Sequence, residues 1–570
     1  MNGRPQRAPS PAAPSWPQQG LSPTFHGGLQ LEAASWGLPC EVLAPQGGWV
    51  RCGHALQGRP IRARRGRGPG GEQGLTSHVL MALLILLLLG LLGLWGLLQA
   101  WARDPSPAPR WPPGPRPLPL IGNLHLLRLS QQDRSLMELS ARYGPVFTVH
   151  LGRQKTVVLT GFEAVKVALM GPGQELADRP PIAIFQLIQQ GGGIFFSSGA
   201  HWRAARHFTV RALHSLGVGR ELMADKILQE LKCLSEQLDG YEGRPFPLAL
   251  LGWAPSNIIF TLLFGCRFDY RDPMFVSLLG LIDEVMVLLG SPGLQFFNIY
   301  PCLGALLQLH RPVLRKIEEV QAILRTLLEA RRPHVRRGDP VRSYVDALIQ
   351  QGQGDDPEGL FAEPNAVACI LDMVMAGTET TSATLQWAAL LMGRHLDVQG
   401  RVQEELDRVL GPGRPPRPED QQELPYTSAV LHEVQRFITL LPHVPRCTAA
   451  DTKLGGFLLP KGTPVIPLLT SVLLDETQWQ TPDQFNPGHF LDADGHFVKQ
   501  EAFLPFSAGR RVCVGERLAR TELFLLFAGL LQRYRLLPPP GVSPASLDTT
   551  PARAFTMRPQ AQALCVVSRP

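Results

Sequence analysis

The feature that most constrains this chain is a run of twenty uncharged residues, 79–98, made almost entirely of Leu, Ile, Val, Ala, Gly, Met and Trp. A helix of about 20 apolar residues spans a bilayer, so we expect one transmembrane helix over 79–98. A buried core helix is rarely apolar on every side for so long. A cleaved signal peptide is the closer alternative, but the run is long for its apolar part and no small-x-small cleavage site follows.

Residues 1–78 contain no Lys or Asp and are rich in Pro, Gly and Arg, so we expect them to be disordered. Met81 opens the apolar run and is a natural start, which would make this leader an upstream extension of the gene model. With that start, the positive charges Arg103, Arg110 and Arg116 all follow the helix, which favours a cytoplasmic body. The arginines of the leader would weaken or reverse this bias, so the side of the membrane stays open.

A proline-rich stretch, 99–119, follows the apolar run and predicts a stiff extended hinge, because proline fixes φ and removes a hydrogen-bond donor. No second linker and no repeat interrupts 120–570, which predicts one large domain. Its periodicity is mainly helical with short strand-like runs, so we expect a mainly α fold with small β-sheets. The predicted helices are 218–240, 313–333, 363–395, 397–410, 424–438 and 516–533, and the predicted β regions are 146–151, 156–159 and 453–469.

The formal charge of +7 does not indicate a nucleic-acid partner. The leader holds eight Arg and three Glu, so most of the excess lies there, and no basic run is interleaved with aromatic residues. The nine cysteines are scattered without any Cys-x-x-Cys pair. Neither a zinc site nor a disulfide framework is therefore indicated.

One of these cysteines stands in the segment Phe-Ser-Ala-Gly-Arg-Arg-Val-Cys-Val-Gly, residues 506–515. A turn at Gly509 delivers Cys513 to the start of an amphipathic helix, whose dipole and N–H groups lower the pKa of a thiol. Arg511 is placed to meet an anionic group, and Gly515 leaves room for a flat ligand close to the backbone. Taken alone, a cysteine before a helix is more often a buried structural residue.

The whole segment resembles the cysteine-ligand loop of the cytochromes P450, Phe-x-x-Gly-x-Arg-x-Cys-x-Gly, at every fixed position. The resemblance extends over about 111–565 and implies the cytochrome P450 fold, preceded by one transmembrane helix, with Cys513 as the thiolate ligand of haem b. The proline hinge and the Ala-Gly-Thr-Glu-Thr-Thr string resemble vertebrate microsomal family 2. Segments 120–127 and 506–515 are most similar to its W subfamily.

A second motif, Glu433-Val-Gln-Arg436, places a carboxylate and a guanidinium on one helical face. The resemblance implies a buried pair that holds the fold and is tied to the segment 485–490. His489 stands there where the family usually has Arg, which we expect to weaken the third arm of this network.

The string 376–381, Ala-Gly-Thr-Glu-Thr-Thr, lies within a predicted helix, where Gly costs about 1 kcal/mol relative to Ala. A close helix–helix contact would explain it equally well. The resemblance implies instead a kinked helix over the iron, with Thr380 donating to dioxygen and Glu379 on the path that supplies protons. Asp372, Ala376 and Thr380 repeat every four residues, so they share a face that we expect to line a substrate cavity.

The carboxylates of a buried haem need cationic or hydrogen-bonding partners. Trp202 and Arg206 resemble the family's Trp-x-x-x-Arg, and Arg446 occupies the position of a third partner. Together with Arg511, these residues are expected to form a cationic cradle.

The resemblance implies a monooxygenase of the endoplasmic reticulum (microsomal) membrane, since a thiolate ligand favours cleavage of the O–O bond. NADPH–cytochrome P450 reductase would supply two electrons, and cytochrome b5 stays open as a further partner. Arg203, Arg510, Arg517 and Arg520 form either a docking patch for an acidic flavoprotein or an ordinary solvated face.

An apolar pocket should receive a lipophilic small molecule, and indoles, retinoids, fatty acids and lysolipids are all compatible with it. Phe195 and Phe196 could stack on a flat substrate, although phenylalanines are more often plain core. By match to the family, the pocket residues are expected to be Ile194, Phe195, Phe196, Asp372, Met375, Ala376, Leu441 and Val444.

Three alternatives to a monooxygenase stay open. A haem-thiolate isomerase or dehydratase needs no external electrons, but the adjacent Glu379 and Thr380 favour activation of O2. A haem-binding sensor or carrier would bind the cofactor without turnover. A membrane-tethered scaffold would bind no cofactor at all.

Overall fold

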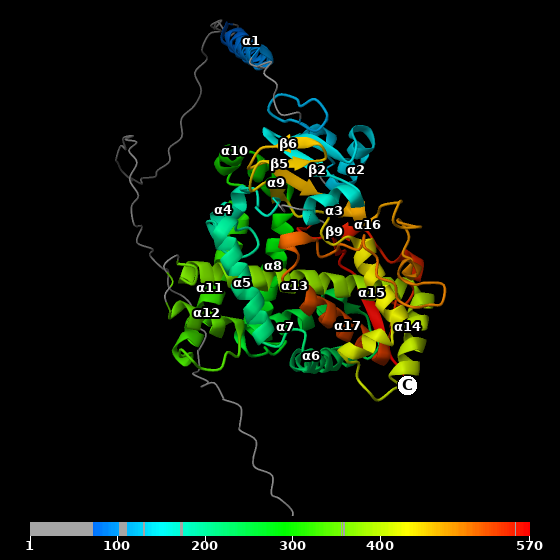
Figure 1. The fold of residues 1–570 in the computed structure, drawn as a ribbon. Coiled ribbons are helices and arrows are strands. Elements are labelled where there is room, and N and C mark those ends of the chain that lie inside the picture. Colours follow the sequence, from blue (N-terminus) through cyan, green and yellow to red (C-terminus); the bar gives the residue numbers. More distant parts are fainter. Residues whose placement is uncertain are drawn as a thin grey trace, which may run out of the picture. The chain divides into compact units, whose positions relative to one another are not determined.

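The computed structural model describes residues 72–101, 111–128, 131–171, 175–354, 356, 359–552 and 554–569 (Figure 1). Residues 1–71 of the predicted leader and 102–110 of the predicted hinge lie outside these ranges. The helices are α1 Glu72–Trp101, α2 Gln132–Tyr143, α3 Phe162–Met170, α4 Ala183–Gln189, α5 Gly199–Ser215, α6 Glu221–Asp239, α7 Trp253–Phe264, α8 Pro273–Leu289, α9 Pro292–Ile299, α10 Pro301–Leu306, α11 Arg311–Arg331, α12 Tyr344–Gly352, α13 Glu363–Arg394, α14 Leu396–Val409, α15 Pro425–Ile438, α16 Thr470–Leu473 and α17 Glu516–Arg533. The strands are β1 Val146–Leu151, β2 Gln154–Leu159, β3 Phe246–Pro247, β4 Arg446–Cys447, β5 Thr452–Leu454, β6 Phe457–Leu459, β7 Pro464–Pro467, β8 Tyr534–Leu537, β9 Pro551–Ala552, β10 Arg558–Pro559 and β11 Ala563–Ser568.

The predicted mainly α fold with small sheets is confirmed, and all six predicted helices are present with ends within three residues of those expected. Helices such as α7 and α8 were missed. Their apolar residues surround the helix on nearly every side, which removes the 3.6-residue period that reveals an amphipathic helix.

Helix α1 begins at Glu72 and ends at Trp101, so it is longer at both ends than the helix expected over 79–98. Its first turns include residues that we expected to be disordered. Among the described residues, no single helix is both long and apolar enough to cross a bilayer, and Leu83–Gly96 counts only as a shorter apolar helix. Helices α8 and α9, bent by 59° at the break between them, reach the required length and hydropathy only as a pair.

The largest sheet, with the order β1-β2-β7-β4, joins the two predicted front strands to the predicted β region 453–469. Strands β1 and β2 are antiparallel, and β2 runs parallel to β7 with Val157 opposite Val465. The short edge strand β4 pairs Arg446 with Val465. The sheet therefore fixes the backbone of one of the predicted haem partners.

The last part of the predicted hinge belongs to the folded body. Thr148 of β1 donates from its N–H to Pro113 O at 2.8 Å and from Oγ1 to Pro112 O at 2.9 Å. Lys155 Nζ lies 3.7 Å from the ring centre of Trp111. An extended proline segment leaves its carbonyls unpaired, and a neighbouring strand can use them as acceptors.

Helix α13 crosses the middle of the body, with α6, α7 and α17 on one side and the strands β2, β5 and β6 toward the opposite end (Figure 1). Helix α17, which we expected to be amphipathic, is instead buried on every side over 522–531. Helix α17 is buried on every side because it packs against both α6 and α13. The segment that precedes α17 is thus held against the centre of the core.

Candidate active site

Cys513 closes a tight loop that starts at Phe506. The N–H of Cys513 donates to Phe506 O at 3.1 Å, and α17 begins three residues later. Gly509 adopts a left-handed backbone with φ 71°, and a Cβ there would overlap the carbonyl oxygen of Leu169. Only glycine fits this turn. The predicted delivery of Cys513 to the start of a helix is therefore present.

Cys513 is accessible to solvent, and many protein atoms lie around its thiol. Burial raises the pKa of this thiol, while the N–H groups of Gly515 and Glu516 and the charge of Arg206 act in the opposite direction. Our expectation of a lowered pKa is wrong for the protein chain by itself, because the loss of hydration outweighs the helix start. Coordination to a metal cation would deprotonate the thiol.

Two buried arginines lie close to this loop and repel each other. Burial, with the charge of Arg206 as the next cause, lowers the pKa of Arg446 to about 10. Burial lowers the pKa of Arg511 to about 9, with the charge of Arg446 as the next cause. A buried group of like charges is costly without an anion, so this region favours a negatively charged ligand.

Two buried side chains here have hydrogen-bond donors without an acceptor. A haem fits the site only if its carboxylates can serve as acceptors for such donors. Arg446 is 1% exposed, and its Nη2 donates to Ser507 Oγ at 2.9 Å. Its Nε and Nη1, and Nε1 of the buried Trp202, have no hydrogen-bond partner in the described part of the chain. The two carboxylates of haem would accept from these donors, so the residues fit the group.

Arg511 and Arg206, also expected in the cationic cradle, donate to backbone carbonyls of this region. Arg511 donates from Nε to Ala177 O at 2.6 Å and from Nη2 to Ser197 O at 2.5 Å, and its guanidinium lies 3.8 Å from the ring centre of Trp202. Arg206 Nη2 donates to Val512 O at 2.7 Å. Arg511 therefore positions Trp202, whereas Arg206 holds the backbone next to Cys513.

A further buried arginine, Arg179, was missed in the sequence. It donates from Nε to Phe195 O at 2.9 Å and from Nη1 to Pro445 O at 2.6 Å. A single Arg before two prolines carries no local signal of this role.

Thr380 lies within α13, which is one uninterrupted helix over Glu363–Arg394. Thr380 Oγ1 donates to Ala376 O at 2.8 Å. Ala376 is exposed although Met375 and Thr378 beside it are buried, so solvent-sized space reaches the helix here. At Gly377 a Cβ would overlap Ile259 of α7, so the close helix–helix contact that we left open is also present.

Glu379, expected on a proton path, is held by the segment around β10. Its Oε1 accepts from Thr556 Oγ1, and its Oε2 lies 3.2 Å from Arg558 Nη2. Arg558 also pairs with Asp283. Burial raises the pKa of Glu379, and the charge of Arg558 opposes this rise.

The predicted pocket residues differ in their contacts and in their exposure. Phe196 stacks on Phe185 with ring centres 3.4 Å apart and meets Phe195 edge-on at 4.7 Å. Phe185 also meets Phe555 edge-on at 6.5 Å, and neither Phe185 nor Phe555 was predicted. Ala376 is exposed and Leu441 and Val444 are half-buried, whereas Ile194 and Met375 are buried. Asp372, expected to line the pocket, instead turns its carboxylate to the backbone of Ile194 and Phe195.

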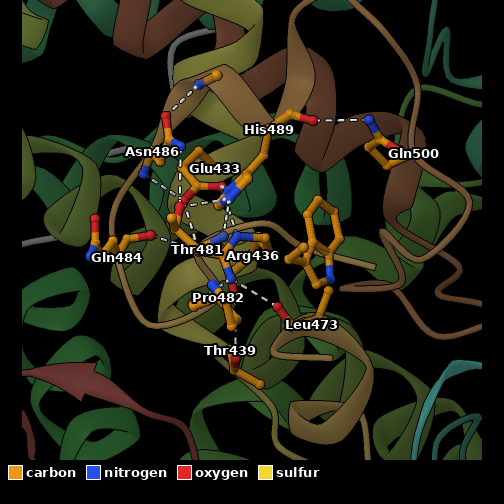
Figure 2. Close-up of polar contacts among 12 residues, drawn as sticks. Glu433, Arg436, Thr439, Leu473, Thr481, Pro482, Gln484, Asn486, His489 and Gln500 are labelled. Carbon is orange, nitrogen blue, oxygen red and sulfur yellow. Dashed lines mark hydrogen bonds and ion pairs between the residues drawn. The ribbon is translucent and has the colours of Figure 1, made fainter. Parts of the chain in front are cut away.

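The Glu433–Arg436 pair is fully buried and doubly hydrogen-bonded, with both N···O distances 2.7 Å (Figure 2). Arg436 also donates to the carbonyls of Leu473, Pro482 and Gln484. We expected His489 to weaken the network, yet its Nδ1 lies 3.1 Å from Glu433 Oε2 and its Nε2 lies 3.0 Å from Thr481 Oγ1. The imidazole ring therefore bridges Glu433 and Thr481, and the third arm is present.

The basic residues proposed for partner docking differ in exposure. Arg203, Arg510 and Arg517 are exposed, and the half-buried Arg520 pairs with Glu516 of its own helix at 2.9 Å.

Comparison with known proteins gives one family. The family model for cytochrome P450 matches residues 112–566. The chain is 92% identical to human cytochrome P450 2W1 over 490 residues, which are 86% of this chain and 100% of that protein. It is 75% identical to mouse cytochrome P450 2W1 over 83% of this chain and 96% of that protein. It is 42% identical to zebrafish cytochrome P450 2K6 over 79% of this chain and 90% of that protein.

Proposed function

The chain belongs to the cytochrome P450 family and is a haem-dependent monooxygenase of its microsomal family 2, W subfamily. From this membership we propose that it inserts one oxygen atom from O2 into a lipophilic small molecule, with electrons from NADPH delivered by a flavoprotein reductase. The bound haem supplies the activation of O2, and the protein supplies orientation, protons and exclusion of water.

The observation that supports this proposal best is the combination of an accessible Cys513 with unused donors on Arg446 and Trp202. Cys513 would ligate the iron, and the two donors would receive the carboxylates of the haem. Arg206 and Arg511 would hold the ligand loop and Trp202 in place.

Thr380 and Glu379 are proposed to serve proton delivery. The Thr380 hydroxyl donates to Ala376 O, which leaves its oxygen lone pairs free to accept from a water beside the exposed Ala376. Glu379 is buried beside Thr380 in the sequence, and Arg558 holds its carboxylate. Because burial raises the pKa of Glu379, it is better able to carry a proton near neutral pH than an exposed glutamate.

The substrate is proposed to lie against the aromatic cluster that contains Phe195 and Phe196. This cluster and the half-buried Leu441 and Val444 offer apolar contacts and favour a lipophilic molecule.

We propose that the chain is anchored in the membrane of the endoplasmic reticulum. The uncharged run within α1 and the microsomal relatives support this proposal. The exposed Arg203, Arg510 and Arg517 support docking of an acidic flavoprotein, and cytochrome b5 is a further candidate partner.

The proposal is tested with the full chain, purified with haem and combined with purified reductase and NADPH. We expect NADPH-dependent formation of a product with one added oxygen atom from a panel of indoles, retinoids, fatty acids and lysolipids, and isotopic O2 identifies the source of that atom. Absence of oxidised product from the whole panel would contradict the monooxygenase proposal and favour a carrier.

A further inference from the structure

His432 of α15 makes a hydrogen bond at each nitrogen of its ring. Its Nδ1 lies 2.7 Å from Ser428 O, one turn earlier on α15, and its Nε2 lies 3.1 Å from Arg520 Nη1 of α17. A carbonyl only accepts and a guanidinium only donates, so Nδ1 carries the proton and Nε2 accepts from Arg520. His432 therefore supplies an acceptor that reaches from α15 to α17.

Three aromatic rings surround this imidazole. The ring centres of Phe490, Phe497 and Phe503 lie 5.5, 4.7 and 4.8 Å from that of His432. Burial lowers the pKa of His432 to about 4, so the ring is neutral at physiological pH and keeps the lone pair to which Arg520 donates. The acceptor is thus held in one place and in one protonation state.

Arg520 contacts residues on both sides of Cys513. Its Nε and Nη2 lie 3.0 and 2.9 Å from Glu516 Oε1, and its guanidinium carbon lies 4.9 Å from the ring centre of Phe506. The backbones of these two residues bind the cysteine. Phe506 O accepts from the N–H of Cys513 at 3.1 Å, and the N–H of Glu516 donates to its sulfur. Arg520 therefore holds both ends of the loop that carries Cys513.

The same guanidinium offsets a negative charge close to the thiol. Burial raises the pKa of Cys513, and the charge of Glu516 acts in the same direction. Pairing with Arg520 reduces the effect of that charge. The side chain of Arg520 is 33% exposed, so it has room to turn toward water if the acceptor on His432 is removed.

We propose that His432 is a positioning residue for the cysteine loop: its Nε2 holds Arg520 where this guanidinium binds Glu516 and packs on Phe506. This inference rests on the proposed function of the site. Partners that orient a metal ligand and its hydrogen bonds set the electronic properties of the bound metal. Loss of the His432 acceptor should therefore change the properties of the thiolate without any direct contact with it.

The test uses the purified full-length holoprotein and two readouts that need neither reductase nor turnover. The first is the rate at which the dithionite-reduced carbon monoxide complex loses its red-shifted Soret band at a fixed temperature. The second is the reduction potential of the haem iron. A hydrogen bond to the sulfur withdraws electron density from it, so a weaker bond from the Glu516 N–H should make this potential more negative.

Asparagine and glutamine separate the roles of the two ring nitrogens. In His432→Asn the amide lies in the place of Nδ1 and can donate to Ser428 O, but no acceptor reaches Arg520. In His432→Gln the amide oxygen lies in the place of Nε2 and can accept from Arg520. We expect His432→Asn to lose the band roughly tenfold faster and to have a more negative potential, because a hydrogen bond to a charged group is lost. His432→Gln should keep the native potential and a rate within about twofold of native.

His395→Asn is the matched control, because His395 is also half-buried beside an aromatic ring, that of Phe485 at 5.1 Å. This variant should keep both native readouts even if its thermal midpoint falls. Equal rates and equal potentials in His432→Asn and His432→Gln would overturn the proposal.

If His432→Asn does not retain haem, Arg520→Met removes the same contact from the other side and should also lose the band faster. A native rate and a native potential in Arg520→Met would overturn the proposal as well. A native holoprotein without the red-shifted band would instead contradict the proposed haem-thiolate site itself.

Discussion

Arg446 donates a single hydrogen bond, from Nη2 to Ser507 Oγ at 2.9 Å, and two further nitrogens of this buried guanidinium have no partner in the described ranges. Ser507 lies in the loop that ends at Cys513, so the Arg446 guanidinium lies against the loop of the proposed iron ligand. A buried charge in this state indicates a site built for an anion.

Replacement of Arg446 by Leu should weaken haem retention at least about tenfold, because a charge-assisted hydrogen bond to a carboxylate contributes roughly 1.5–3 kcal/mol. The rate of haem transfer to excess apomyoglobin measures this effect. The exposed Arg408→Leu is the control and should retain haem like the native protein. Equal retention in both variants would argue against Arg446 as a partner of the cofactor.

Thr380→Ala should uncouple electron consumption from product formation. The Thr380 hydroxyl is lost, so proton delivery slows while electron transfer continues. We expect NADPH consumption to stay within about twofold, the product formed per NADPH to fall at least about tenfold, and hydrogen peroxide to rise. Thr380→Ser keeps the hydroxyl and should restore most of the coupling. Full coupling in Thr380→Ala would exclude this role.

His489→Leu should destabilise the protein by about 1–3 kcal/mol, because Glu433 then keeps a buried oxygen with one donor fewer. Urea unfolding followed by circular dichroism measures the change. The comparison is His496→Leu, since His496 is an exposed histidine paired with Asp492. A loss for His489→Leu no larger than that for His496→Leu would mean that the imidazole bridge contributes nothing.

Glu522 of α17 is 1% exposed, its Oε1 has no partner within the described part of the chain, and burial raises its pKa well above the usual 4.5. The folded protein therefore keeps a proton that the unfolded chain releases above pH 4.5. The stabilising contribution of this protonated carboxyl is complete below that pH and declines as the pH rises toward the folded-state pKa. Within this window the decline is about 1.4 kcal/mol per pH unit.

Glu522→Gln is neutral at every pH and should remove this dependence. Thermal unfolding at pH 5 and pH 8 should show the variant gaining stability relative to the native protein as the pH rises. A constant difference between the two proteins at both pH values would show that Glu522 is not protonated in the fold.

The sequence was most informative where a function depends on a local motif. Cys513, Gly509 and the Glu433–Arg436 pair each occupy fixed positions within a short segment, so their arrangement was predictable. The bridge made by His489 was not, because it depends on whether the ring reaches both Glu433 and Thr481 across a turn.

The parts that the sequence did not reveal depend on contacts between distant segments. Arg179, Phe185 and Phe555 come from three separate stretches, and none carries a local pattern. Asp372 was expected in the pocket because it shares a helical face with Ala376 and Thr380. Its actual partner is the backbone of a loop, which periodicity cannot predict.

The most direct test of the central claim is the difference spectrum of the reduced protein with carbon monoxide. The native protein and the exposed-cysteine control Cys302→Ser should both show the red-shifted Soret band that thiolate ligation produces, and Cys513→Ser should lose that shift. A red-shifted band that survives in Cys513→Ser, or one that is absent from the native holoprotein, would contradict the assignment of Cys513 as the iron ligand.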